Sequence, residues 1–240
     1  VWSRMMIEAE WWDYDDMDEL AEAVAGDVGF IIESAIDARG SAVIALAGGK
    51  TPGPILEKLA QAKIDWKRVT IFPTDERIVP LDDPMCNVAS LARIFLPKGA
   101  RVVPIISEKA ADYKAAGGAA SSRISDFHWP PDLVWLGVGE DGHTASIFNG
   151  PDLEDALNAP AERKAVGVMP DPLPPEAPVA RVTLTRNAIQ SAKSLVIVLT
   201  GNAKRKLLEQ AIKDGDSSHL PVGRVLAGLE TPVDIHWCEG

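Results

Sequence analysis

The chain alternates between short, uninterrupted apolar runs and longer stretches in which apolar residues recur every three or four positions. Apolar runs with no polar alternation are typical of parallel strands buried on both faces, and the second pattern is typical of amphipathic helices. Repeated strand–helix units of this kind predict an open, mostly parallel, doubly wound α/β sheet with flanking helices. We expect strands at 41–46, 69–73, 101–106, 133–137, 194–199 and 233–237, and helices at 17–39, 52–62, 87–95 and 110–127, with a further one holding Lys204.

The length and apolar content fit one α/β domain over residues 1–240, because 240 residues with 46% apolar side chains can build a sizeable core. A small elaboration is expected around 150–180. Its proline-rich part, 170–178 (PDPLPPEAP), predicts an extended surface loop rather than a linker between domains.

The charge balance excludes several classes of partner. A net charge of −11 argues against a nucleic-acid-binding face, which would have to be basic. No apolar run approaches the ~18 residues of a membrane span, and the acidic, aromatic start of the chain does not resemble a secretion signal, so a cytoplasmic location is expected. Cys86 and Cys238 lie far apart in sequence and are expected to be ordinary thiols.

The first strand end that could bind a ligand is the segment 41–52 (SAVIALAGGKTP). The backbone N–H groups at Gly48 and Gly49, and those at the start of the following helix, predict an anion site. Thr51 adds a hydroxyl and Lys50 adds a positive charge. A plain strand-to-helix connection with Thr51 as its cap fits this loop equally well.

Two further strand ends carry charged or titratable side chains. The run VTIFPTDER places Asp75 and Arg77 directly after a buried strand, and the run DLVWLGVGEDGHTAS presents Asp141 and His143 in a glycine-rich turn. Taken alone, the charges of the first run could equally belong to a solvated loop. Asp141 and His143 of the second run could equally serve only to shape the turn. Because ligands bind at the carboxyl ends of parallel strands, we expect the three strand ends to line one crevice.

Neither a cofactor nor a metal ion is indicated. The glycines of 137–142 (GVGEDG) match a dinucleotide fingerprint, but no strand ending in an acidic residue follows at the required distance. Asp75, Asp141 and His143 would have to meet in space to bind a metal, and the chain has no H-x-x-x-H spacing.

The order of the motifs carries a family resemblance. GGKTP, TDERIVP, GVGEDGHTASIF, RVTLT and GNAK, in that order over residues 48–204, resemble the 6-phosphogluconolactonase family. The chain is more distantly similar to the glucosamine-6-phosphate deaminases, which share the fold and the Asp-Gly-His turn. The resemblance implies a Rossmann-like sheet of the sugar-phosphate isomerase/deaminase type.

The resemblance implies hydrolysis of 6-phospho-D-glucono-1,5-lactone to 6-phospho-D-gluconate in the oxidative pentose phosphate pathway, with no cofactor. His143 is then the general base, because an imidazole of pKa ~6.5 can take a proton from water near neutral pH. Asp75 either orients that imidazole or holds the sugar hydroxyls. The oxyanion would be stabilised by backbone N–H groups around Gly48, Gly49 or Gly142, or by Arg77.

By the family pattern, the phosphate is held by Thr51, by Arg181 of RVTLT and by Lys204 of GNAK. The phosphate loop departs from the family at Ala47, where a serine is usual, and at Lys50.

Two alternatives stay open. One is a deaminase-like enzyme acting on glucosamine 6-phosphate, although Ser146, Ile147 and Phe148 stand where deaminases carry an acidic residue for ring opening. The other is a non-catalytic sugar-phosphate sensor, which would need the phosphate loop but not His143 and Asp75.

Overall fold

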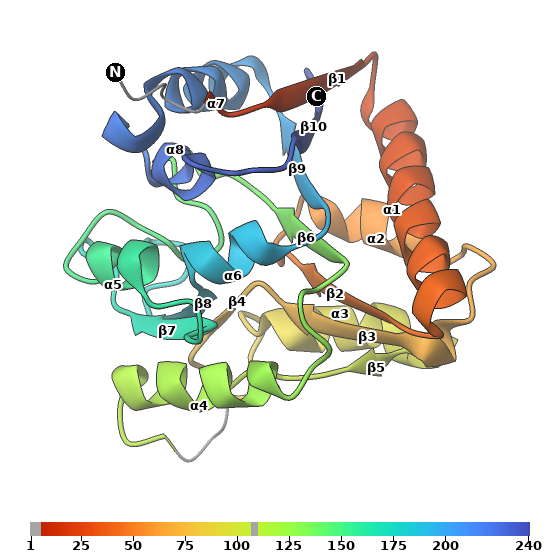
Figure 1. Cartoon of the computed structure of the whole chain (residues 1–240), viewed down its shortest axis with the longest axis horizontal. Coiled ribbons are helices and arrows are strands. Elements are labelled where there is room, and N and C mark those ends of the chain that lie inside the picture. Colours follow the sequence, from red (N-terminus) through yellow and green to blue (C-terminus); the bar gives the residue numbers. More distant parts are fainter. Residues whose placement is uncertain (1–5, 107–109) are drawn as a thin grey trace.

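A computed structural model describes residues 6–106 and 110–240 and shows helices on both faces of a seven-stranded parallel sheet (Figure 1). The strand order is β1-β10-β9-β6-β2-β3-β5, and every neighbouring pair runs parallel. The bounds are β1 (Ala9–Tyr14), β2 (Ala42–Leu46), β3 (Val69–Pro73), β5 (Arg101–Val102), β6 (Leu133–Leu136), β9 (Leu195–Thr200) and β10 (Val233–Cys238). The predicted doubly wound sheet is confirmed.

The helices bury two separate apolar cores, one on each face of the sheet. Alternate residues of β2 show the division, since Ile44 packs with α1, α2 and α3 while Ala45 packs with α4 and the helices near the C-terminus. The helices are α1 (Met17–Arg39), α2 (Pro52–Leu59), α3 (Asn87–Phe95), α4 (Tyr113–Ser125), α5 (Leu153–Asn158), α6 (Arg186–Ser191), α7 (Asn202–Asp214) and α8 (Pro221–Leu226). Burial on both faces explains why the strand sequences are continuously apolar.

Helix α1 has clear start and stop signals. The Asp16 side chain accepts a hydrogen bond from the backbone N–H of Glu19, and Gly40 ends the helix in a left-handed conformation with φ of 83°. Both residue types are favoured at these positions. A carboxylate at the helix start accepts from a backbone N–H that has no partner in the helix, and glycine adopts the left-handed conformation without a Cβ clash.

A second, three-stranded antiparallel sheet stands beside the main one. It consists of β4 (Asp75–Arg77), β8 (Arg181–Leu184) and β7 (Ala165–Val168), in that order. Arg77 of β4 pairs directly with Arg181 of β8. The predicted elaboration at 150–180 contains α5 and β7, and its proline-rich segment forms neither helix nor strand, as expected.

Some boundaries differ from those predicted. Strand β5 stops at Val102 rather than at 106, because Pro104 has no N–H to donate to a neighbouring strand. Helix α2 ends at Leu59 rather than at 62. Helix α4 spans Tyr113–Ser125 rather than 110–127. Its expected start adjoins residues 107–109, which lie outside the described part of the chain. Strand β1 was not predicted, and β10 lies inside the sheet between β1 and β9.

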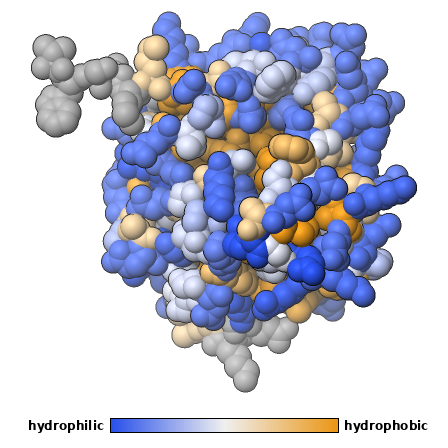
Figure 2. Space-filling view, turned by 45° about the vertical axis from the view of Figure 1, so that its right-hand side comes forward, coloured by the Kyte–Doolittle hydropathy of each residue, from blue (hydrophilic) through white to orange (hydrophobic). Residues whose placement is uncertain are grey.

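Polar and charged side chains predominate on the face shown in Figure 2, with the apolar residues lying mostly deeper between them. Among the described residues, no helix combines the length and apolar character needed to span a membrane.

Candidate functional site

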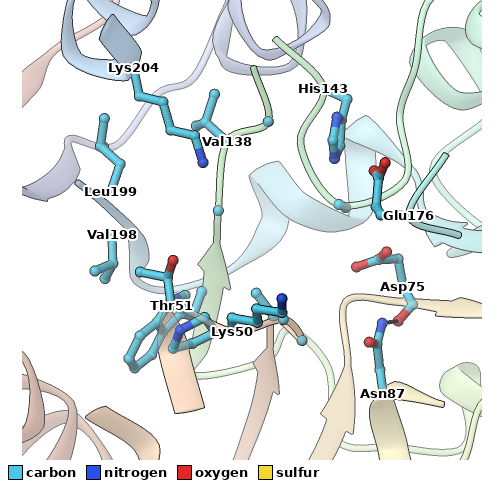
Figure 3. Close-up of a pocket in the computed structure, with 18 of the residues that line it drawn as sticks. Lys50, Thr51, Asp75, Asn87, Val138, His143, Glu176, Val198, Leu199 and Lys204 are labelled. Atoms are coloured by element: carbon cyan, nitrogen blue, oxygen red, sulfur yellow. Dashed lines mark hydrogen bonds between the residues drawn. The ribbon is translucent and has the colours of Figure 1, made fainter. Parts of the chain in front are cut away.

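A cavity of about 260 Å³ opens at the carboxyl ends of the central strands β2, β3, β6 and β9 (Figure 3). Each of these strands is followed by a segment that contributes polar groups to its wall, as expected for a parallel sheet. The sequence-predicted residues among the lining are Gly48, Gly49, Lys50, Thr51, Asp75, Arg77, His143, Arg181 and Lys204. The expectation of one shared crevice is therefore met for these residues.

The loop after β2 brings a close backbone approach to the cavity wall. A Cβ at Gly48 would stand 2.2 Å from Oδ1 of Asn87, so a larger residue would displace the Asn87 amide, and Gly49 has φ of 107°. Thr51 precedes α2 with helical backbone angles, and its side chain makes no capping hydrogen bond. The alternative in which Thr51 caps the helix is therefore not realised, and in the described part of the chain its hydroxyl is left available to a ligand at the cavity wall.

His143 is held in one orientation by three neighbours. Its Nδ1 is hydrogen-bonded to the carboxylate of Asp141, its ring stacks on Phe148 at 4.1 Å between centroids, and a Cβ at Gly139 would lie 2.1 Å from its Cε1. The backbone N–H of His143 also donates to Asp141 at 3.1 Å. Nδ1 is thereby engaged, which leaves Nε2 as the ring atom available for chemistry.

The charge of Asp141 is stabilised by this pairing. Burial alone would raise the pKa of Asp141, but the hydrogen bonds and the charge attraction from His143 outweigh it and hold the pKa below its usual value. Asp141 therefore carries its negative charge beside the imidazole throughout the neutral range. It does not line the main cavity, but an adjoining one.

Gly142 shapes the turn and does not face the main cavity. It has φ of 81°, and its N–H donates to the carbonyl of Gly139 at 3.0 Å. Since that donor is used inside the turn, Gly142 is not a free source of oxyanion stabilisation. Ala145, which does line the cavity, has a positive φ of 47°, an uncommon conformation for a residue with a Cβ.

Asp75 is buried and fixed by two hydroxyl groups. Thr74 Oγ1 donates to Oδ1 at 2.8 Å, and Ser146 Oγ donates to Oδ2 at 2.6 Å. Its backbone carbonyl accepts from Nδ2 of Asn87 at 2.9 Å, the bond drawn in Figure 3. No hydrogen bond joins Asp75 to His143 in the described part of the chain, so the imidazole is oriented by Asp141 instead.

Two guanidinium groups border the cavity from the small sheet. Arg77 donates from Nη1 to the carbonyl of Met85 at 2.9 Å, and buried Arg181 donates from Nη2 to the carbonyl of Ala177 at 2.9 Å. The Arg181 guanidinium lies 4.8 Å from the centre of the Phe148 ring, the same ring on which His143 stacks. Burial lowers the pKa of Arg181 from its ordinary value, with a further contribution from neighbouring Arg77.

Lys204 approaches from the opposite wall. It stands in the first turn of α7, and Figure 3 shows its side chain reaching into the cavity across from His143, on the side where Thr51 lies. Within residues 6–106 and 110–240 it takes part in no salt bridge. Its charge is therefore available to an anionic ligand.

Sequence reasoning assigned no role in the site to three residues, namely Asn87, Ser146 and Glu176. Asn87 and Glu176 line the cavity, while Ser146 braces Asp75 from behind. Ser146 and Asp75 are 71 positions apart, so no local pattern links them. Across the described ranges, no cluster of three or more His, Cys, Asp or Glu side chains has the arrangement of a metal site.

Comparison with known proteins assigns the fold and these motifs to a family. The profile of the glucosamine-6-phosphate isomerases/6-phosphogluconolactonase family matches residues 15–237. The chain belongs to this family. The membership confirms the resemblance read from the GGKTP, TDER and DGHTAS motifs.

The family relatives match over almost their whole length. A 6-phosphogluconolactonase of Rhizobium meliloti is 36% identical over 228 residues, covering 93% of this chain and 96% of the relative. One from Pseudomonas putida is 34% identical, covering 93% and 90%. The crystal structure of a 6-phosphogluconolactonase from Shewanella baltica superposes with a TM-score of 0.87 at 31% identity, covering 97% of this chain and 99% of that one.

Proposed function

We propose that this protein is a 6-phosphogluconolactonase, which hydrolyses 6-phospho-D-glucono-1,5-lactone to 6-phospho-D-gluconate. The observation that carries the proposal is the His143–Asp141 pair at one wall of a cavity whose opposite wall holds Thr51 and Lys204. A base at one end and a phosphate site at the other match a sugar ester with its reactive carbon at C1 and its phosphate on C6. The names of the matched relatives support the same reaction.

The phosphate end is anchored by backbone and cations. The N–H groups at the Gly48–Gly49 turn, the hydroxyl of Thr51 and the ammonium of Lys204 supply donors of the kind that phosphate prefers. Lys50 borders the same space. Binding of the phosphate fixes the sugar ring and so places C1 against His143. The phosphate contacts achieve this although none of them touches the reacting atoms.

The chemical step is assigned to His143 without a metal ion. Nε2 takes a proton from a water molecule while the water oxygen bonds to C1, and the carbonyl oxygen becomes an oxyanion. The C1–O5 bond then breaks, Nε2 returns the proton to O5, and the new acid group loses its proton to solvent. Asp141 keeps the imidazole in the required tautomer and stabilises it when it carries both protons.

Asp75 and the two arginines complete the assignment. Because both oxygens of Asp75 are oriented by hydroxyl donors, the carboxylate presents its remaining acceptor sites to sugar hydroxyls rather than to His143. Arg77 borders the cavity as a donor to the oxyanion. The family pattern assigns Arg181 to the phosphate, and its guanidinium lies 4.8 Å from the Phe148 ring, on the His143 side of the cavity.

The test is the disappearance of freshly generated lactone at neutral pH, with a chelator present, measured against spontaneous hydrolysis. We expect acceleration that survives the chelator and is lost in His143→Ala, which should still bind 6-phosphogluconate. Loss of activity on chelation would contradict the metal-free step. Failure of the folded protein to accelerate hydrolysis, with ammonia release from glucosamine 6-phosphate, would favour a deaminase, and failure of both would favour a sensor.

A further inference from the structure

The cavity does not end at His143. An adjoining cavity of about 660 Å³ shares His143, Gly139, Glu176 and Lys204 with the first and continues beneath the proline-rich loop. Its wall is rich in carboxylates, contributed by Glu140, Asp141, Asp171 and Glu176. A ligand group that moves past His143 therefore enters a region of negative charge.

Glu176 is the carboxylate that lines both cavities. Figure 3 shows it on the His143 side of the cavity, between His143 and Asp75 in this view and away from Thr51 and Lys204. Within the two described ranges, its side chain makes no hydrogen bond and no ion pair. Its charge is therefore not neutralised by a direct partner, although Arg181 lies within its electrostatic reach.

The loop holds Glu176 in place although the side chain itself is exposed. The neighbouring Ala177 is fully buried, its N–H donates to the carbonyl of Pro174 at 3.2 Å, and its carbonyl accepts from Arg181 at 2.9 Å. Prolines at 172, 174, 175 and 178 further restrict the backbone. The carboxylate is thus presented from an anchored backbone rather than from a freely moving loop.

The proposed reaction changes the charge of the ligand at this end only. The lactone and its product carry the same phosphate, but a neutral ester at C1 becomes a carboxylate. Ring opening also converts a compact ring into an extended chain, so the new carboxylate is free to reach beyond His143. That direction leads toward Glu176 and the acidic adjoining cavity.

We infer that Glu176 is a specificity-determining residue that weakens the binding of the carboxylate product relative to the neutral lactone. The inference rests on the proposed lactonase function. Arg77, proposed above as the donor to the oxyanion, would also hold a finished carboxylate, and the negative charge of Glu176 lining the same cavity opposes that retention. Glu176 acts on the product through charge repulsion across the cavity, not through a bond to the reacting atoms.

A different role would give a different result. If Glu176 accepted hydrogen bonds from sugar hydroxyls, its removal would weaken lactone and product alike, since both carry these hydroxyls. If Glu176 served only to position Arg181, its removal would likewise affect both ligands. Only repulsion of the carboxylate makes the product bind more tightly when the charge is removed.

The experiment compares the KM for the lactone with the competitive inhibition constant of 6-phosphogluconate in the wild type, in Glu176→Gln and in Glu176→Lys. Glu162→Gln is the matched control, because it removes the same charge from an exposed position outside both cavities. We expect the ratio of inhibition constant to KM to fall about three- to tenfold in Glu176→Gln, to fall further in Glu176→Lys, and to stay unchanged in Glu162→Gln. Added salt should narrow the difference between wild type and Glu176→Gln.

An unchanged ratio in an active Glu176→Gln enzyme, or the same fall in Glu162→Gln, would overturn this inference alone. Absence of lactone hydrolysis by the wild type would overturn the proposed function and this inference together. Circular dichroism and thermal unfolding of each variant establish that the comparison is made between folded proteins.

Discussion

Nδ1 of His143 is hydrogen-bonded to the carboxylate of Asp141, while Asp75 is bonded to the hydroxyls of Thr74 and Ser146. The two acids of the site therefore have separate tasks. One sets the tautomer and position of the proposed base, and the other faces the space where sugar hydroxyls would lie.

Asp141→Asn should lower kcat about 10- to 1,000-fold with a smaller effect on KM, because an amide cannot stabilise a doubly protonated imidazole. Steady-state kinetics on the lactone measure both constants. Asp171→Asn is the control, since it removes a carboxylate from the adjoining cavity without touching His143. An undiminished kcat in Asp141→Asn would show that His143 needs no carboxylate partner.

Ser146→Ala should weaken lactone binding and destabilise the fold by about 1–2 kcal/mol, because a buried oxygen of Asp75 loses its donor. KM and the free energy of unfolding in denaturant measure the two effects. Ser125→Ala, which removes an exposed hydroxyl that donates to the carbonyl of Ser121 within α4, should change neither. A normal KM in Ser146→Ala would argue against Asp75 as a sugar ligand.

Gly139→Ala should reduce kcat at least about 100-fold while the protein stays folded. The added Cβ would stand 2.1 Å from Cε1 and 2.2 Å from Nδ1 of His143, so the ring must leave its place between Asp141 and Phe148. Gly118→Ala in α4, where no atom of residues 6–106 and 110–240 lies within 4 Å of the new Cβ, is the control. Wild-type activity in Gly139→Ala would mean that the ring position does not matter.

Glu76 predicts a pH dependence of stability that is separate from catalysis. Its carboxylate accepts from the backbone N–H groups of Asn87 and Val88 at the start of α3, at 2.7 and 2.8 Å, yet burial dominates and raises its pKa from 4.5 to about 7. A raised folded-state pKa means that the native protein binds a proton more tightly than the unfolded chain.

The contribution of Glu76 to stability is therefore fully present below pH 4.5 and is lost as the pH rises to about 7. The loss should amount to about 3–4 kcal/mol, from a shift of about 2.5 pH units at ~1.4 kcal/mol each. Denaturant unfolding between pH 4.5 and 8 should show this slope in the wild type relative to Glu76→Gln, which cannot ionise. Parallel profiles for the two proteins would refute the assignment.

The sequence predicted the architecture because burial on both faces leaves a direct mark on composition. Strands β2, β6 and β9 are continuously apolar, and α1 carries its cap at Asp16 and its stop at Gly40. Strand β1 leaves no such mark, since its segment AEWWDY lies at the edge of the sheet and is half exposed. Its membership of the sheet depends on a partner more than 200 residues away, which no local pattern reveals.

The site residues were predicted by type but not by pairing. The motifs predicted that Asp75, Asp141 and His143 would be functional, whereas the identity of the acid bonded to His143 depends on the path of the turn in space. Glu176 escaped notice because the proline-rich segment has no periodicity to interpret. Ser146 was noted only as a difference from the deaminases, since its bond to Asp75 joins two strand ends.

The pairing of β1 with β10 also limits when β1 can enter the sheet during synthesis. Trp12 and Asp234, which meet across these strands, are 222 positions apart, so β1 leaves the ribosome long before its neighbour exists. Until β10 is present, Trp11 lacks the backbone pairing of β1 with β10. It also lacks Trp237, and in the folded protein the Arg205 guanidinium lies over the rings of both tryptophans. The strands that carry the cavity, β2, β3, β6 and β9, do not depend on this pairing, whereas β1 joins the sheet only through β10.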